Sequence, residues 1–170
     1  MHVRPATIDD AEAIRAIYNP EVLESTVTFD LVPRSLAEQQ AWLAQRSGAH
    51  LVIVAVDDDD TVLGFASLSP YRDRPAYSTT VEDSVYVHRD HQGEGVGVLL
   101  LADLVDRARR HGFHAVMARI VGDHEASIGL HRKVGFDVVG TEREVGRKFG
   151  QWLDVVIMQI LLADPAADPA

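Results

Sequence analysis

The 170-residue sequence predicts an α/β (α+β) fold organised around a mixed β-sheet. Three observations favour this class. β-Rich runs alternate with longer segments in which apolar residues recur at helical spacing. The runs 51–56 and 61–68 are separated only by the acidic turn 57–60, which is typical of an antiparallel hairpin. Other runs are separated by a whole helix, which is typical of a crossover connection.

The first elements expected are a strand over 3–6 and a helix that begins near Asp9 with Thr7 as its cap. The apolar side of this helix consists of Ala13, Ile14, Ile17 and Tyr18. We expect Pro20 to disturb the helix, because proline has no amide N–H to donate.

A second helix is predicted to begin at Ser35. Glu38, three residues later, completes a reciprocal capping pattern. Leu36, Trp42 and Leu43 are its predicted apolar side.

After the hairpin we expect a strand over 79–87 and an amphipathic helix over about 95–111, closed by Gly112. The apolar residues of this helix at i, i+3, i+4 and i+7 are Leu101, Leu104, Val105 and Ala108. A strand over 115–121 follows. The remaining elements are a helix over 125–134 closed by Gly135 and strands over 136–141 and 153–161.

Composition indicates one soluble domain over 1–162, followed by a flexible tail over 163–170. Hydrophobic residues make up 46% and charged residues 25% of the chain, and no run is long enough to cross a bilayer. No secretion signal is recognisable, so we expect a cytoplasmic protein. The absence of cysteine excludes disulfides and thiolate chemistry.

The net charge of -10 argues against nucleic acid and against anionic membrane surfaces as partners. Of the eight histidines, only His88 and His91 have a spacing that suits a metal, and no further ligand repeats a known motif. We therefore expect no metal site.

The most informative segment is 85–97, where a strand leads through alternating glycines into a helix. Glycines allow a ligand to approach the backbone, and free N–H groups in the first turn of a helix bind phosphate oxygens. This pattern predicts a diphosphate site. A dinucleotide fingerprint fits poorly, because Val98 and Leu100 occupy positions where a further glycine would be needed.

The segment resembles the phosphate loop of the GNAT superfamily of N-acetyltransferases, Gln/Arg-x-x-Gly-x-Gly/Ala, through Gln92, Gly95 and Gly97. The stretch 123–136 resembles that family's Asn-x-x-Ser-x-x-Leu-(Tyr/His)-x-x-x-Gly-Phe element. The resemblance implies a mixed, mostly antiparallel central sheet with helices on both faces. It also implies that main-chain amides hold the pyrophosphate of coenzyme A, and that residues 85–87 bond its pantetheine arm like an added strand.

The residues that the resemblance assigns to acetyl-CoA are Val85, Tyr86, Val87, Gln92, Gly93, Glu94, Gly95, Val96, Gly97, Val98, His124, Ser127, His131 and Lys133. Two of them depart from the family pattern. His124 stands where the family has Asn. Glu94 stands where Lys or Arg is common, so its side chain is expected either to point to water or to weaken coenzyme binding.

A closer resemblance, to the phosphinothricin and methionine sulfoximine acetyltransferases, covers nearly the whole chain and is carried by 25–29, 80–87, 127–136 and 146–155. It implies transfer of acetyl to the α-amine of a small amino acid analogue, by direct attack in a ternary complex. It also implies a homodimer, with Trp152 and Asp154 serving packing or the dimer contact.

Glu82 is the candidate base, because it directly precedes the pantetheine-binding residues and matches an acidic residue of this subfamily. The alternative is a solvent-facing strand residue on the side opposite Val81 and Val85. His131 occupies the position of a Tyr that acts as general acid or thiolate stabiliser in the superfamily, and its alternative is packing within the helix.

A zwitterionic acceptor needs cations for its carboxylate and apolar walls. The candidate substrate residues are Phe29, Arg72, Arg74, Tyr77, Glu82 and Val121.

The sequence leaves two alternatives open. One is transfer to another amine, such as a peptide N-terminus, a polyamine or an aminoglycoside, and the other is a non-catalytic sensor of acetyl-CoA.

Overall fold

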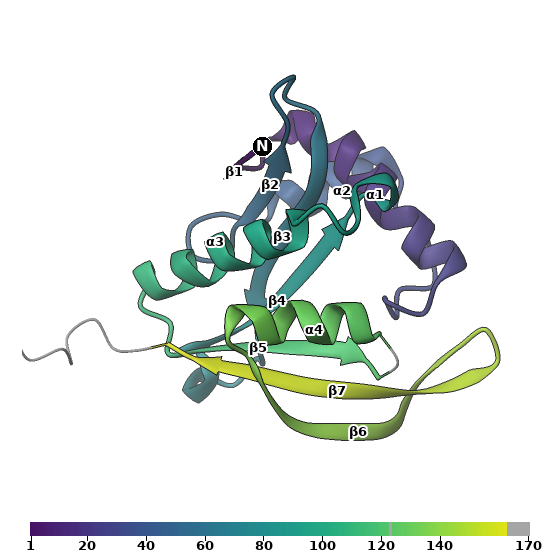
Figure 1. The fold of residues 1–170 in the computed structure, drawn as a ribbon, viewed down its shortest axis with the longest axis vertical. Helices are drawn as coiled ribbons and strands as arrows, with labels where there is room; N and C mark the ends of the chain where they lie inside the picture. The colour runs from purple at the N-terminus through teal and green to yellow at the C-terminus, as the bar shows by residue number, and fades with distance from the viewer. Residues whose placement is uncertain (123, 163–170) are drawn as a thin grey trace, which may run out of the picture.

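The computed structural model describes residues 1–122 and 124–162, and its centre is a seven-stranded sheet with the order β1-β2-β3-β4-β5-β7-β6 (Figure 1). The strands are β1 (His2–Pro5), β2 (Val52–Val56), β3 (Val62–Pro70), β4 (Thr80–Val87), β5 (Ala115–Val121), β6 (Asp137–Lys148) and β7 (Gln151–Leu161). The helices are α1 (Ala11–Glu24), α2 (Leu36–Ala44), α3 (Val96–Arg110) and α4 (Glu125–Val134), with short 3-10 turns at Ile8–Asp10, Pro75–Tyr77 and Arg89–His91. The predicted tail 163–170 and Asp123 lie outside the described residues.

The sheet is mixed and mostly antiparallel, as predicted. β4 and β5 pair in parallel, and the other neighbouring strands are antiparallel. The hairpin expected from 51–56 and 61–68 is formed by β2 and β3.

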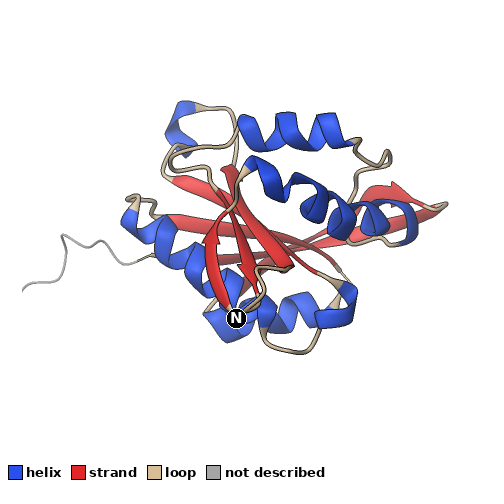
Figure 2. Cartoon of the chain, turned by 90° about the horizontal axis from the view of Figure 1, so that it is seen from above, coloured by secondary structure: helices blue, strands red, loops and turns tan. Residues whose placement is uncertain are grey.

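Helices cover both faces of the sheet, which confirms the expected layering (Figure 2). The alternation of side chains along β2 shows how one strand serves two cores. Val52, Val54 and Val56 pack with α1 and α2, whereas Ile53 and Ala55 pack with α3 and α4. All five are buried, so β2 reads as an unbroken apolar run in the sequence.

Two expectations about the helices were wrong in part. α1 continues through Pro20 to Glu24, because Ile17 and Val22 on either side of the proline are both buried in the core and hold the helix in place. Leu36 begins α2 but is 42% exposed, whereas Leu43 is buried and Trp42 packs against the core as predicted, and Gln39 completes the buried side. The reciprocal caps at Ser35 and Glu38 are present as predicted.

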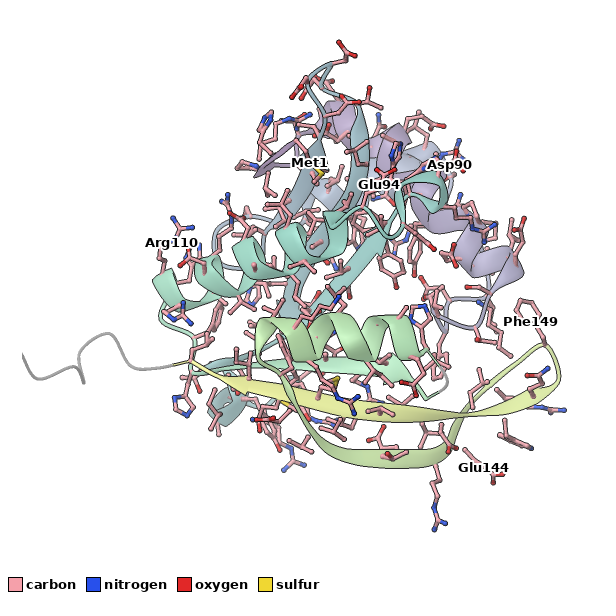
Figure 3. The ribbon with its side chains drawn as sticks, viewed as in Figure 1. Met1, Asp90, Glu94, Arg110, Glu144 and Phe149 are labelled. Atoms are coloured by element: carbon pink, nitrogen blue, oxygen red, sulfur yellow. The ribbon has the colours of Figure 1, made fainter. Side chains whose placement is uncertain are left out.

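The β6–β7 hairpin is longer than predicted, because β6 runs to Lys148 instead of ending at Thr141. Its tip, where Phe149 lies, projects beyond α4 (Figure 3). The Lys148 side chain is buried and its Nζ donates to the carbonyls of Thr28, at 2.8 Å, and Glu21, at 3.3 Å. Lys148 thereby fastens the hairpin to the end of α1 and to the loop that follows it.

Lys148→Met is expected to lower the free energy of unfolding by about 1–3 kcal/mol, because it leaves buried carbonyl oxygens without a donor. Denaturant unfolding measures this loss. The matched control is Lys133→Met, which changes an exposed lysine on α4 and should stay within about 0.5 kcal/mol of the wild type. Equal losses in the two variants would contradict the role of Lys148 as a fastener.

Candidate functional site

β4 and β5 diverge after a short parallel ladder (Figure 1). Their ladder covers only residues 80–82 of β4 and 115–117 of β5, although both strands continue further. The space between the diverging ends is a cleft of about 300 Å³, lined by both strands and by α4. The gap is held open because β3 and β7 pair with the outer edges of the two strands throughout.

The inner edge of β4 beyond Glu82 is an unpaired strand edge inside the protein. Val85, Tyr86 and Val87 lie on it and line the cleft. Main-chain N–H and C=O groups on such an edge pair readily with an extended ligand that carries amide groups. The pantetheine arm expected for residues 85–87 has this chemistry.

The glycine-rich turn lies between β4 and α3 at the end of the cleft. Gly93 and Gly95 have φ angles of +83° and +87°, a conformation that strongly favours glycine. α3 begins directly after them, so the main-chain N–H groups of Val96, Gly97 and Val98 belong to its first turn. A 15-residue helix adds its dipole to these amides, which suits a phosphate.

Gly97 lies at the contact between α3 and α4. A Cβ at this position would lie 3.1 Å from Leu130 Cδ2, so the glycine allows α3 and α4 to approach each other closely.

The side chain of Glu94 points to solvent, which decides between the two expectations for this departure from the family pattern (Figure 3). It is 57% exposed, and its Oε2 lies 3.0 Å from Nδ1 of His91. On the same turn, Arg89 donates to Glu21 and Glu24 of α1. These contacts hold the turn against the end of α1.

The other coenzyme candidates divide into two groups. Gln92, His124, Ser127 and His131 line the cleft. Lys133 is exposed on α4 and is not among the residues that line it.

His131 is buried and both of its ring nitrogens have protein partners. Nδ1 lies 2.7 Å from the carbonyl oxygen of Ser127, and Nε2 lies 3.0 Å from Oδ2 of Asp83. A carbonyl oxygen only accepts, so Nδ1 carries a proton. Burial lowers the pKa of His131, but the hydrogen bond and charge of Asp83 outweigh it, and the net pKa is raised above 6.5.

Glu82 precedes Asp83 on β4 and therefore faces the opposite side of the sheet. It is half-buried and lines the cleft, in contrast to the alternative of a solvent-facing residue. Burial raises the pKa of the Glu82 carboxyl, although the nearby Arg119 guanidinium opposes the shift. A carboxyl with a raised pKa at a cleft is suited to proton transfer near neutral pH.

A second hollow adjoins Glu82 on the face away from α4. Its lining residues are Tyr71, Arg72, Glu82, Arg119, Glu142 and Val145. Arg72 is the predicted cation that the fold brings beside Glu82. Arg74 and Tyr77 are absent from both linings, and Tyr77 packs edge-on against Tyr71, with 5.6 Å between the ring centroids.

The predicted apolar walls lie in the main cleft. Phe29 and Val121 both line it. The ring of Phe29 rests on Gly146 of β6, where a Cβ would overlap the ring atoms. The hairpin thus sets the position of this wall.

Sequence reasoning missed Asp83 and Arg119. A signal for each was present, because Arg119 is the only charge in an otherwise apolar strand and Asp83 is a second carboxylate beside Glu82. Neither signal identifies a partner, since His131 is 48 residues from Asp83 and Glu142, which pairs with Arg119, is 23 residues away.

Among residues 1–122 and 124–162, no group of three or more His, Asp or Glu residues is placed to hold a metal ion. Within the same part of the chain, no helix combines the length and the apolar character that crossing a bilayer requires.

Glu82→Gln is expected to make the protein more stable relative to wild type as the pH rises from about 4 to 7. Because the pKa of Glu82 is raised above 4.5, the folded protein binds more protons than the unfolded chain in the window above this value. The stability of the wild type therefore falls as the pH rises through that window. Glutamine does not titrate, so the free energy of unfolding of Glu82→Gln does not fall in this way. Urea unfolding of both proteins at several pH values measures the difference.

The control for this comparison is Glu12→Gln. Glu12 is an exposed carboxyl whose pKa is lowered by its hydrogen bond with Arg15, so its replacement should change relative stability in the opposite direction. Parallel pH profiles for wild type and Glu82→Gln would contradict the raised pKa.

Comparison with known proteins agrees with this geometry. The family model described as "Acetyltransferase (GNAT) domain" matches residues 3–157. L-methionine sulfoximine/L-methionine sulfone acetyltransferase of Pseudomonas paraeruginosa is 43% identical over 164 residues, which cover 96% of this chain and 95% of the relative. Phosphinothricin N-acetyltransferase of Streptomyces coelicolor is 42% identical over 158 residues, covering 91% of this chain and 92% of the relative.

Solved structures are similar over the same range. The phosphinothricin acetyltransferase of Sinorhizobium meliloti in complex with AcCoA superposes with a TM-score of 0.91 and 37% identity, covering 99% of this chain and 92% of that chain. The chain therefore belongs to the GNAT acetyltransferase family and is an acetyl-CoA-dependent acyltransferase.

Proposed function

We propose that the chain transfers acetyl from acetyl-CoA to the α-amine of a small amino acid analogue. Phosphinothricin and methionine sulfoximine, after which two of its relatives are named, are examples of this class of acceptor. The observation that carries this proposal is the cleft between β4 and β5, which extends from Gln92, beside the glycine-rich turn, to Glu82, where the hollow that contains Arg72 adjoins it. Such an opening lets two substrates meet from opposite faces of one sheet and react directly in a ternary complex.

Acetyl-CoA is proposed to bind along the inner edge of β4. Amides of the turn 93–98 hold its diphosphate, residues 85–87 bond its pantetheine arm, and Gln92, His124 and Ser127 line its path. Lys133 is exposed near the end of α4, outside the cleft, and is proposed to contact phosphate groups of acetyl-CoA that extend beyond the cleft.

The acceptor is proposed to enter from the face of Glu82. Arg72 and Arg119 form a pair of cations for its carboxylate, and Arg74 and Tyr77 support the loop that carries Arg72. Phe29 and Val121 form the apolar wall for its side chain.

The chemistry assigned to the two catalytic candidates follows from their surroundings. Glu82 accepts a proton from the ammonium group, directly or through water, and leaves a neutral nitrogen. That nitrogen attacks the thioester carbonyl, the amide C–N bond forms, the C–S bond breaks, and the nitrogen releases its second proton to solvent in the cleft. His131 gives a proton to the departing sulfur, so the products are an N-acetyl amino acid and free coenzyme A thiol.

The acceptor class is tested by coenzyme A release with methionine sulfoximine, phosphinothricin and methionine sulfone, compared with spermidine and an N-terminal peptide. We expect turnover with the first three, because a carboxylate is needed to engage Arg72 and Arg119. Faster turnover of spermidine or the peptide would favour the rival acceptors. Binding of acetyl-CoA without thiol release on any amine would identify a sensor.

In the same assay Glu82→Gln is expected to lower kcat by about 10²–10⁴-fold, as loss of a general base does. Glu12→Gln, far from the cleft, should keep the wild-type rate. Retention of wild-type turnover by Glu82→Gln across the pH range would remove Glu82 from the mechanism.

The chain is further proposed to act as a homodimer of single domains spanning 1–162, in the cytoplasm and without a nucleic-acid or membrane partner. Three apolar residues near the tip of the β6–β7 hairpin support a dimer, since Val145, Phe149 and Trp152 are each more than half exposed. Asp154 instead bonds within the hairpin, where its Oδ1 accepts from the Glu144 amide at 2.8 Å.

Light scattering is expected to give the mass of two chains for the wild type and of one chain for Trp152→Glu, because a buried carboxylate opposes an apolar contact. A monomeric wild type would refute the dimer.

The net charge of -10 supports the absence of a polyanionic partner.

A further inference from the structure

We propose that Asp83 is a positioning residue that keeps His131 doubly protonated and fixed in the wall of the cleft. The inference rests on the proposed function of His131 as proton donor, and adds the group that makes this function available. Three observations on the pair carry it, namely its isolation, its geometry and its place on the cleft wall.

The pair is isolated from solvent. The side chains of Asp83 and His131 are 2% and 4% exposed, and they lie 3.0 Å apart across the β4–α4 interface. Oδ1 of Asp83 is buried without a hydrogen-bond partner among the described residues, so His131 is the group that compensates this carboxylate. A buried charge with a single partner is strongly coupled to it, because low dielectric strengthens their attraction.

The geometry favours a doubly protonated imidazole. Nδ1–H is committed to the carbonyl of Ser127, so a neutral ring would present the lone pair of Nε2 to a carboxylate oxygen. Two acceptors facing each other at hydrogen-bond distance repel. A proton on Nε2 removes this repulsion, and the edge-on contact of the ring with Phe136, with 5.0 Å between centroids, fixes the ring plane.

Other charges around the cleft do not replace Asp83. Glu82 and Arg119 lie on the strands, His124 at the start of α4 and Glu21 on α1. The pKa of His131 responds to Asp83 and to the Ser127 carbonyl, and not to Glu82, Arg119 or Glu21. Asp83 is thus the carboxylate in direct contact with the imidazole.

The consequence for turnover is a proton held ready at Nε2. When the departing sulfur takes this proton, the hydrogen bond between Nε2 and Asp83 Oδ2 breaks, and the pair changes from an imidazolium and a carboxylate to a neutral imidazole and a carboxylate. The negative charge left behind is buried and raises the proton affinity of the pair, so a proton from solvent restores His131 for the next cycle.

The first test needs no activity. In a protein with isotope-labelled histidine, NMR should show both ring nitrogens of His131 protonated at about pH 7.5, where an ordinary histidine is neutral. The signal is assigned by its loss in His131→Gln. In Asp83→Asn the pKa of His131 is expected to fall below 6.5, because burial is then no longer opposed by a carboxylate. A neutral ring in the wild type at that pH would overturn the inference, as would an unchanged titration in Asp83→Asn.

The second test separates positioning from packing. Asp83→Asn should lower kcat by about 10–100-fold, leave KM for acetyl-CoA within about twofold, and move the alkaline limb of the kcat profile to lower pH. In a His131→Gln background the same substitution should cost less than about threefold, because Asp83 acts through His131. Additive losses would overturn the inference.

Asp83→Ser serves as a second neutral variant if Asp83→Asn does not fold, and it should lower the pKa of His131 in the same way. If wild-type His131 is doubly protonated and responds to Asp83 but no amine is acetylated, the proposed function fails while the positioning holds. If amines are acetylated but His131 is neutral, the positioning fails while the proposed function holds.

Discussion

The divergence of β4 and β5 is the constraint on which the rest of the structure depends. Two parallel strands pair for three residues and then separate, while antiparallel partners hold their outer edges in place. Unpaired strand edges are costly inside a protein unless something binds to them. The opening therefore supplies main-chain hydrogen-bonding groups to a ligand, and it connects the two faces of a sheet that otherwise separates them.

The alternation of side chains along β4 divides the polar groups between these two faces. Glu82 faces the hollow that holds Arg72, and Asp83 faces α4 and His131. Each is a buried or half-buried carboxyl that a purely structural strand would avoid. Removing these carboxyl groups from water costs free energy. The hydrogen bond between Asp83 and His131 offsets part of this cost, and burial of apolar neighbours such as Val81 stabilises the strand. Stability is given up at this strand in exchange for polar groups at the cleft, among them the Glu82 carboxyl with its raised pKa.

The walls of the cleft are held by contacts between segments far apart in the chain. Arg89 ties the glycine-rich turn to Glu21 and Glu24 of α1, and Lys148 ties the β6–β7 hairpin to the carbonyls of Glu21 and Thr28. The end of α1 is therefore the common anchor for both walls. Sequence alone indicated neither contact, because Lys148 lies more than a hundred residues from its partners.

The sequence by itself determined the mixed fold, most element starts and the glycine-rich turn, because these depend on local periodicity, capping and turn residues. The family followed from the resemblance of 92–97 and 123–136 to its motifs. The sequence also indicated Glu82 and His131. Only the tertiary structure decided that α1 continues through Pro20, that Arg119 joins Arg72, and that Asp83 meets His131. These outcomes depend on which surfaces pack together and on the burial of each charge, and neither quantity is set by residues adjacent in the chain.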